Sequence, residues 1–204
     1  DFPPNILRKL RIGDRIEIFS CGLGLKLLDY PEITVLNTSP DLLMRWGLSE
    51  RDGILYAPVT HLVPGAIMGS GLGRNTAWRV DYDIQLADPG IRRRYRLGSL
   101  RFGDMVGILH ADNRFGPTYR QGWVTIAVIV HSDSTVSGHG PGVSPLLTGP
   151  MHRLRPVYVP RANLAAIFDL RALPPLRTYR PLADSSLSTS PRFARQLTKN
   201  YLRA

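Results

Sequence analysis

Hydrophobic residues recur at alternate positions in short runs along the chain, and glycine and proline interrupt these runs throughout. This pattern is typical of many short β-strands. In residues 15–19 it places Ile16 and Ile18 on one face of a strand that follows a Gly-Asp turn. Residues 100–109 repeat the same plan around a second Gly-Asp turn. The repetition indicates two related β units.

The most apolar segment is residues 123–130, which read Trp-Val-Thr-Ile-Ala-Val-Ile-Val. Its hydrophobic residues do not alternate with polar ones, so both faces of this strand should be covered. We therefore expect the segment to lie at the centre of a sheet.

Signals for helices are few. Ser39 as N-cap, followed by proline and, after seven further positions, by Gly47, predicts a short helix over residues 40–46. Apolar residues at helical spacing predict a second helix over residues 161–173, which a pair of prolines ends. A third helix, basic and amphipathic, is expected near the end of the chain, over residues 191–203.

Together these elements predict a mainly β fold, barrel-like or roll-like, with a few short helices. We expect residues 1–173 to form a β-rich core domain. Residues 174–204 are rich in proline and serine and should form an extended C-terminal arm that ends in the third helix. So short a helix is unstable alone in water. The third helix should therefore dock on a neighbouring subunit or on the protein's own core. We favour an arm that reaches a neighbouring subunit of a homo-oligomer or another chain.

Charge adds a possible kind of partner. The chain of 204 residues has 26 basic and 16 acidic residues, a net charge of +10, and every basic residue except Lys9, Lys26 and Lys199 is arginine. Much of the excess lies in the C-terminal arm and in a patch over residues 92–96. An anionic partner would meet these two regions first. A nucleic acid is the less favoured partner, because arginine richness also follows genome composition.

The sequence also indicates the cellular compartment in which the protein should be found. The sequence contains neither an apolar stretch long enough to span a membrane nor a standard signal peptide. Cys21 is the single cysteine, so an intrachain disulfide and a cysteine-based zinc cluster are excluded. This usage fits a reducing compartment, and we expect a cytoplasmic protein. The apolar surroundings of Cys21 predict an inert, packed thiol.

A glycine-rich segment, Gly-Ser-Gly-Leu-Gly-Arg-Asn, occupies residues 69–75. Its glycines permit positive φ and close backbone approach, so successive N–H groups can form a nest for an anion. The spacing differs from that of a dinucleotide-binding fingerprint, and a plain connecting loop is the alternative. Asp112, in a polar turn between strands, is a further candidate. The predicted binding residues are Gly69, Ser70, Gly71, Gly73, Arg74 and Asp112.

Two aspartates lie close together in residues 81–85, Asp-Tyr-Asp-Ile-Gln. On a strand, Asp81, Asp83 and Gln85 share one face. Like charges on one face need solvent, an arginine partner or a cation. With so many arginines in the chain, pairing with arginine is the more ordinary outcome.

Histidines follow the predicted central strand. His131 and Asp133 share a face at its exit, and His139 lies in a glycine-rich loop that can turn back towards it. Histidine combined with carboxylates suits a divalent metal such as Zn or Mn. We therefore predict a metal site of Asp83, His131, Asp133 and His139, in which His131, Asp133 and His139 are also catalytic. The alternative is that these side chains are hydrogen-bonded structural residues.

Six blocks in a fixed order resemble the DUF4438 family of bacteria and archaea. They are Ile12-Gly-Asp-Arg-Ile-Glu-Ile, Gly22-Leu-Gly-Leu-Lys-Leu-Leu-Asp-Tyr-Pro, Met68-Gly-Ser-Gly-Leu-Gly, Asp81-Tyr-Asp-Ile-Gln, Leu100-Arg-Phe-Gly-Asp, and Val130-His-Ser-Asp with Gly138-His-Gly-Pro-Gly-Val. The resemblance implies a β-rich, oligomeric protein and lends no established reaction. It also implies that the family's N-terminal region, which should precede Asp1, is absent from this chain.

Two functions remain open at the level of sequence. The first is metal-assisted hydrolysis of a small polar substrate of the amide type, which a fainter similarity to acetamidase/formamidase-type metal hydrolases also favours. The second is a non-catalytic assembly subunit, whose basic C-terminal arm and arginine patch bind a partner chain or an anionic polymer.

Overall fold

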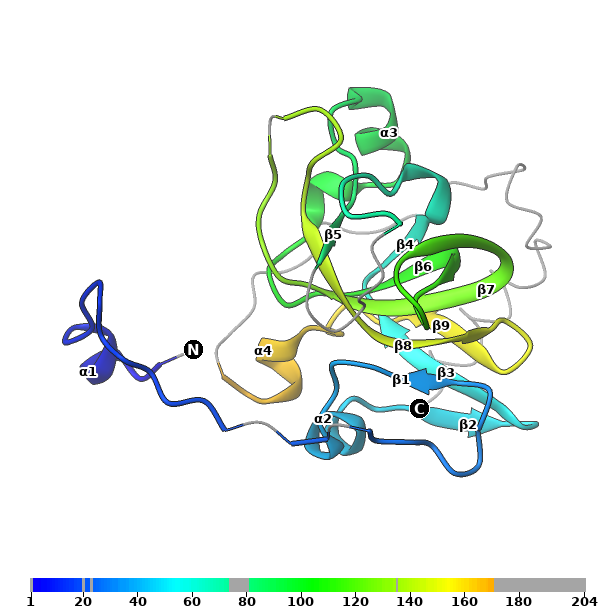
Figure 1. The fold of residues 1–204 in the computed structure, drawn as a ribbon, viewed down its shortest axis with the longest axis horizontal. Helices are drawn as coiled ribbons and strands as arrows, with labels where there is room; N and C mark the ends of the chain where they lie inside the picture. Colours follow the sequence, from blue (N-terminus) through cyan, green and yellow to red (C-terminus); the bar gives the residue numbers. More distant parts are fainter. Residues whose placement is uncertain (1, 20, 23, 74–80, 135, 171–204) are drawn as a thin grey trace.

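The computed structural model describes residues 2–19, 21, 22, 24–73, 81–134 and 136–170, and Figure 1 shows their arrangement. Nine strands and six short helices follow one another in this part of the chain. They are α1 (Pro4–Leu7), β1 (Thr34–Val35), α2 (Pro40–Arg45), β2 (Ser49–Arg51), β3 (Ile54–Val59), β4 (His61–Pro64), η1 (Gly65–Ile67), β5 (Tyr82–Asp83), α3 (Pro89–Arg94), η2 (Leu97–Ser99), β6 (Met105–Asp112), β7 (Thr118–Ile129), β8 (Gly142–Pro150), β9 (Leu154–Tyr158) and α4 (Leu164–Ile167).

The larger sheet has six strands in the order β1-β8-β7-β6-β4, and β5 also pairs with β8. β6, β7 and β8 are joined as antiparallel neighbours, whereas β4 pairs with β6 in parallel. The strand expected at the centre is β7, which has two neighbours on each side along this path. That prediction is confirmed.

Both faces of this sheet are buried. Along β6, Met105 and Leu109 belong to one hydrophobic cluster, whereas Val106 and Ile108 belong to another. Since side chains alternate between the faces of a strand, the two clusters lie on opposite sides of the sheet. This explains why β7 is apolar without alternation.

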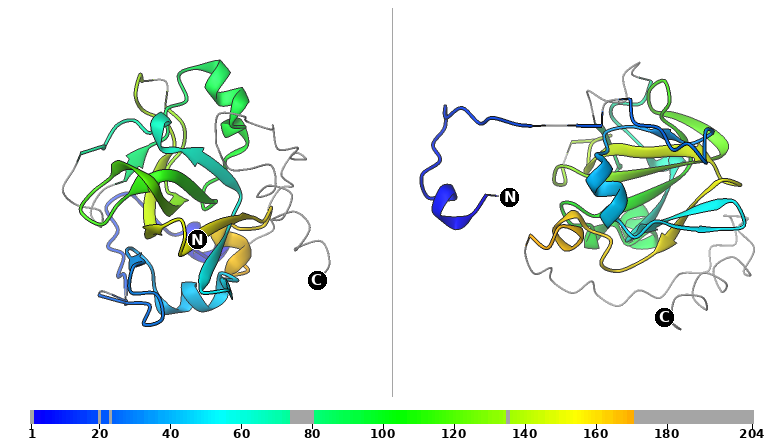
Figure 2. Two further views of the ribbon diagram at one scale, coloured as in Figure 1. Left: turned by 90° about the vertical axis from the view of Figure 1, so that its right-hand side faces the viewer. Right: turned by 90° about the horizontal axis from the view of Figure 1, so that it is seen from below.

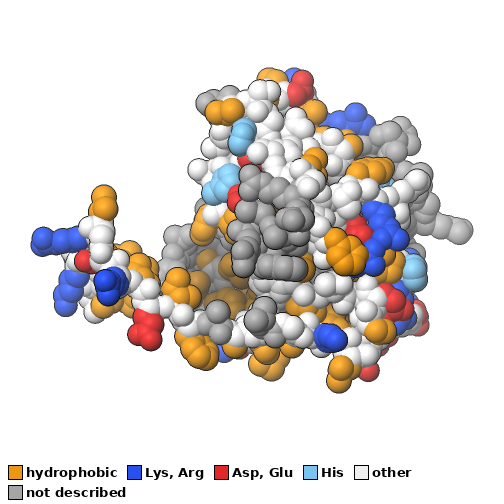
Figure 3. All heavy atoms as spheres, in the orientation of Figure 1, with side chains coloured by type: hydrophobic (Ala, Val, Ile, Leu, Met, Phe, Trp, Pro, Cys, Tyr) orange, Lys and Arg blue, Asp and Glu red, His pale blue; other side chains and the backbone are white. Residues whose placement is uncertain are grey.

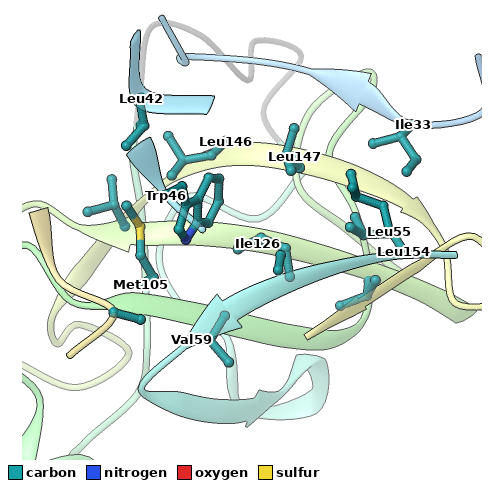
Figure 4. Close-up of a cluster of buried hydrophobic side chains, with 14 of the residues drawn as sticks. Ile33, Leu42, Trp46, Leu55, Val59, Met105, Ile126, Leu146, Leu147 and Leu154 are labelled. Carbon is teal, nitrogen blue, oxygen red and sulfur yellow. The ribbon is translucent and has the colours of Figure 1, made fainter. Parts of the chain in front are cut away.

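A smaller sheet covers one of these faces. It has the order β2-β3-β9, and its β3 and β9 run in parallel. The first cluster fills the space between the layers, where Trp46, the residue after α2, points towards side chains of the larger sheet (Figure 4). The Trp46 indole N–H donates to the carbonyl oxygen of Pro58 at 3.0 Å, which satisfies the one polar atom of this buried ring.

The helices agree with the sequence in part. α2 covers the expected residues, and the Ser39 hydroxyl accepts a hydrogen bond from the N–H of Leu42. α4 is much shorter than the helix expected over 161–173. α3 is a helix that the sequence analysis does not predict, and the Asp88 carboxylate caps it by accepting from the N–H of Ile91 at 2.6 Å.

Residues 15–19 do not form the predicted strand. They are extended and exposed, and they belong to a segment, residues 2–19, that projects from the body of the molecule (Figure 2). A strand needs a neighbour to bond with, and the sheets of the described residues do not include this segment. The two Gly-Asp turns therefore do not mark two equivalent β units. Cys21 is likewise exposed, so the expectation of a packed thiol is wrong.

The mainly β fold with a few short helices is confirmed, but the described strands form open sheets, not a closed barrel. The C-terminal arm, with its predicted basic helix, lies outside the described residues. Among the residues that are described, none of the helices is long and apolar enough to cross a membrane.

Candidate metal centre

The candidate site forms where three strands meet at the start of β8. β5 and β7 lie on opposite sides of this strand: Asp83 of β5 is opposite Gly142, and Ile129 of β7 is opposite Val143. Asp81 immediately precedes β5, and His131 follows β7 by two residues. The topology therefore carries acidic and histidine side chains to the two flanks of one short stretch of backbone.

Gly142 makes room for these side chains to meet. A Cβ atom at this position would overlap both the Nε2 atom of His131 and the Oδ2 atom of Asp81. The imidazole and the carboxylate thus meet over a residue that has no side chain of its own.

Two histidines converge on the aspartates. His131 Nε2 lies 2.7 Å from Asp81 Oδ2 and 3.3 Å from Asp83 Oδ1. His139 Nδ1 lies 3.0 Å from the other oxygen of Asp83, Oδ2. The side chain of Asp83 is only 8% exposed, whereas those of His131 and His139 are 45% and 47% exposed. The Asp83 carboxylate therefore lies at the buried end of the site, and the two histidines face solvent. Figure 3 shows histidine and acidic side chains gathered on one face.

The hydrogen bonding of His131 orients its ring. Nδ1 lies 2.9 Å from the carbonyl oxygen of Ser132 and 3.3 Å from the backbone nitrogen of Gly142. The Gly142 N–H is a donor, so the two contacts need opposite states of Nδ1, and the shorter one, to the carbonyl of Ser132, requires a proton on Nδ1. Nε2 is directed at the two carboxylates. A backbone carbonyl on the distal nitrogen is the usual partner of a metal-binding histidine.

The pKa of His131 is raised above its usual value. The carbonyl of Ser132 is the main cause; burial opposes it, and the carboxylates of Asp81 and Asp83 add to it. A positive charge is therefore favoured at Nε2. A proton on this nitrogen or a cation beside it satisfies the same two carboxylates.

Asp81, Asp83 and His131 form the set that can hold one ion. One ligand atom from each of the three lies within 4.8 Å of the others. Asp81 was not among the predicted ligands, although the Asp-x-Asp pattern placed it on the face of Asp83. Tyr82, Ile84 and Leu86, which alternate with these polar residues, are buried.

Asp133 lies apart from this set. Its carboxylate is 3.1 Å from Arg92 Nη1 and accepts the N–H of Ser134 at 2.8 Å. β7 ends at Ile129, so the alternation of a strand no longer governs the direction of a side chain four residues later. The prediction that Asp133 shares a face with His131 is corrected accordingly. Arg92, one of the arginines of the basic patch, is thereby committed to this loop.

The glycine-rich segment supports the site instead of presenting a nest. The N–H of Gly69 donates to the carbonyl of Asp83, and the carbonyl of Ser70 accepts the N–H of Asp83. Ser70 also donates to the carbonyl of Gly138, while Gly71 packs against Tyr82. These N–H groups are bonded to backbone carbonyls, so they are not free for an anion.

The remaining predicted binding residues lie elsewhere. Gly73 donates its N–H to the carbonyl of Pro117, and Arg74 is outside the described residues. Asp112 is buried and forms ion pairs with Arg114 at 2.9 Å and Arg120 at 3.0 Å. Burial alone would raise the pKa of Asp112, but the bonds from the two arginines outweigh it and lower the pKa. Asp112 therefore stabilises the β6–β7 hairpin.

Comparisons with known proteins place the chain in a family. Residues 45–168 match the family described as "Domain of unknown function (DUF4438), C-terminal", and residues 1–44 match "Domain of unknown function (DUF4438), N-terminal". The second match corrects the expectation that the family's N-terminal region is absent. A search of curated proteins gives no match.

A solved structure supports the same fold. The crystal structure of TM1086 is 39% identical to this chain, with a TM-score of 0.67. The match covers 74% of this chain and 52% of the TM1086 chain. This chain therefore spans about half the length of that relative.

Proposed function

This chain belongs to the DUF4438 family, whose description gives no function, and we propose from the chain's own residues that it is a metal-dependent hydrolase of a small polar substrate of the amide type. Asp81, Asp83 and His131 hold the metal. The observation that carries the proposal is the approach of His131 Nε2 to both carboxylates, at 2.7 and 3.3 Å.

The donor set favours particular metals. One imidazole nitrogen with carboxylate oxygens suits Zn²⁺, Mn²⁺ or Fe²⁺, whereas Mg²⁺ and Ca²⁺ prefer sites made of oxygen alone. Three protein ligands leave positions for water and substrate. A metal in such a site polarises a carbonyl and lowers the pKa of bound water.

His139 supplies a group for proton transfer. Its Nδ1 lies 3.0 Å from Asp83 Oδ2, so an Nδ1 proton donated to this oxygen leaves the lone pair on Nε2. The His139 side chain is half exposed beside the ligands. It can take a proton from the attacking water and return it to the leaving amine, while Asp83 holds the ring.

Metal titration of matched variants tests the ligand set. Calorimetry with Zn²⁺ and with Mn²⁺ should give one site per chain, and Asp83→Asn should lower the affinity by about 100-fold or more, because a buried ligand loses its charge. Asp133→Asn is the control, since the Asp133 carboxylate lies two residues from His131 but pairs with Arg92 and is not one of the three ligands. It should change the affinity by less than about threefold.

Activity tests the reaction. Ammonia release from small primary amides should require added metal, and His139→Gln should lower kcat by about 100-fold while metal affinity changes by less than tenfold. No metal binding by the parent protein, or equal loss in the Asp83 and Asp133 variants, would refute the metal centre. Metal binding without turnover of any amide would refute the substrate class.

A further inference from the structure

Two aliphatic side chains are exposed on the two loops that border the candidate metal centre. Leu72 is 45% exposed and Val136 is 59% exposed. Leu72 is the only aliphatic residue in 69–73, and Val136 is the only one in 131–140; the other residues of both loops are glycine or polar. Each loop therefore presents a single apolar group to solvent.

The turn that ends at Leu72 contacts the strand of both candidate aspartates. The Leu72 N–H donates to the carbonyl of Gly69, which closes the turn. Within this turn the Gly69 N–H donates to the carbonyl of Asp83 at 2.7 Å. A Cβ atom on Gly71 would lie 3.0 Å from the carbonyl oxygen of Asp81. Leu72 thus leaves the turn directly after the residue that packs against Asp81.

Val136 begins the turn that carries His139. The N–H of His139 donates to the carbonyl of Val136 at 3.0 Å. The two loops are joined to each other, because the Ser70 N–H donates to the carbonyl of Gly138 at 2.7 Å. Leu72 and Val136 each lie two residues from this bond. On the face shown in Figure 3, hydrophobic side chains border the histidine and acidic ones.

A substrate site needs apolar surface as well as polar groups. Ligand sites are lined mainly by apolar side chains, and a few polar groups fix the orientation of the ligand. Scattered exposed hydrophobic residues need no explanation, but these two flank one centre from two joined loops. Arg92, which reaches the loop of Val136, already pairs with Asp133 at 3.1 Å. The exposed groups of the two loops thus favour an uncharged apolar substituent over a carboxylate.

We propose that Leu72 and Val136 form an apolar wall that receives the acyl chain of the substrate, so that the preferred amide carries an uncharged aliphatic chain longer than that of acetamide. This inference rests on the proposed function, because the metal centre holds the carbonyl from which the chain extends. A methylene that is fully buried adds about fourfold to affinity, so one placed against this half-exposed wall should add about twofold.

Binding of alkyl hydroxamates tests the proposal without turnover. A hydroxamate binds zinc through its own two oxygen atoms, and its alkyl chain takes the place of the acyl chain of an amide. Calorimetry with the Zn²⁺-loaded protein should show that octanohydroxamate binds at least about tenfold more tightly than acetohydroxamate. Neither compound should bind the protein without metal, which excludes general adhesion of the longer chain.

Matched variants assign the preference to the two side chains. The double variant Leu72→Ser, Val136→Ser should bind octanohydroxamate about tenfold more weakly, while its affinity for Zn²⁺ and for acetohydroxamate changes by less than about threefold. Met44→Ser is the control, since Met44 is 77% exposed on α2 and is not part of either loop. This substitution should leave the preference for the longer chain unchanged.

The possible failures are distinct. If the loaded parent protein binds both hydroxamates equally, or if the double variant keeps the preference, the apolar wall is refuted while the metal centre stands. If the parent protein binds no metal, the proposed function fails and the wall fails with it. Equal losses in the double variant and in Met44→Ser would also contradict the assignment to these two loops.

Discussion

At the scale of single residues, Gly142 is the position on which the candidate centre depends most directly. It opens β8, which lies between β5, where Asp83 is, and β7, which His131 follows by two residues. A Cβ atom at this position would overlap the Nε2 atom of His131. The site is therefore created as much by a missing side chain as by the acidic and histidine side chains around it.

Gly142→Ala should lower the affinity for Zn²⁺ or Mn²⁺ by at least about tenfold, because the His131 ring must move to admit a methyl group. Calorimetry measures the affinity, and circular dichroism checks that the fold is kept. Gly98→Ala is the control, since its Cβ would meet only the far end of the Arg92 side chain. Equal effects of the two substitutions would show that Gly142 has no special place in the site.

Tyr82 fixes the two candidate ligands from beneath. Tyr82 lies between Asp81 and Asp83 in the sequence, and its side chain is buried. Its hydroxyl donates a hydrogen bond to Asn113 Oδ1 at 3.0 Å. Burial raises the pKa of this phenol, so it stays protonated and remains a donor. Because β5 is only two residues long, this bond is a principal anchor of the aspartates.

Tyr82→Phe should therefore cost about 1 kcal/mol of unfolding free energy, the usual value for one buried hydrogen bond. It should also weaken metal binding several-fold through looser placement of Asp83. Urea denaturation and metal titration measure the two effects. A loss of stability with unchanged metal affinity would mean that Tyr82 supports the core alone.

His61 makes stability depend on pH. It is buried, with Thr60 Oγ1 at 2.8 Å from Nδ1 and Ser99 Oγ at 2.9 Å from Nε2. Burial lowers the pKa of His61 to about 4. The unfolded chain, with a histidine pKa of about 6.5, therefore takes up a proton first as the pH falls.

The unfolding free energy should decrease between about pH 6.5 and pH 4, by about 3 kcal/mol from this residue at most. Above pH 6.5 the contribution is fully present. His61→Gln keeps a polar side chain that does not titrate, so its stability should fall less over this range. Urea denaturation at pH 7.5 and pH 4.5 gives the comparison, and identical pH dependence in both proteins would contradict the assignment.

At the scale of elements, the β6–β7 hairpin is held at its far end by a cluster around Asp112. The guanidinium groups of Arg114 and Arg120 lie 4.0 and 4.2 Å from the centre of the Trp123 ring, and both pair with the buried Asp112. Charge, hydrogen bonds and cation–π contacts thus act together on residues 118–122, which are exposed.

Asp112→Asn should loosen this end of the hairpin, because Arg114 and Arg120 lose the negatively charged carboxylate with which both of them pair. We expect faster amide exchange in residues 118–122 and a loss of about 1–2 kcal/mol in unfolding free energy. Asp41→Asn is the comparison, since the Asp41–Arg45 pair is half exposed, and it should cost less than about 0.5 kcal/mol. Equal costs would mean that the burial of Asp112 adds nothing.

The elements that the sequence predicts correctly have local causes. α2 follows from the Ser39 cap, and β7 follows from an apolar run that needs cover on both faces. α3 was missed because its arginines show no apolar periodicity, so only the Asp-Pro cap indicated a helix. Residues 15–19 have the alternation of a strand but lack a neighbour, and alternation cannot supply one.

The candidate site could be predicted only in part for the same reason. Asp83, His131 and His139 were chosen as residue types that bind metals, and the structure brings them together. Asp81 replaces Asp133 because the order β5-β8-β7 decides which side chains meet, and that order depends on pairing between distant strands. Local patterns carry no information on such pairing.

At the scale of the whole molecule, the described parts on which the site depends all lie before the C-terminal arm. Both hydrophobic clusters and the aspartates and histidines of the centre lie between Leu27 and Phe168. β9, near the end of this range, pairs with β3 and is the last strand of the smaller sheet. The fold should therefore be insensitive to removal of the C-terminal arm and sensitive to removal of β9.

A chain that ends at residue 173 should keep its circular dichroism spectrum, its unfolding midpoint and its metal affinity, because every described member of the two clusters lies before that residue. A chain that ends at residue 153 should not fold, because Leu154 and Val157 leave the core and β3 loses its parallel partner. Thermal denaturation and metal titration of both chains measure this.

Loss of metal binding in the longer chain would place part of the centre in the arm. Retained metal binding with loss of affinity for an anionic polymer would assign the arm's positive charge to a separate partner, since electrostatic binding of this kind follows net charge and weakens with salt.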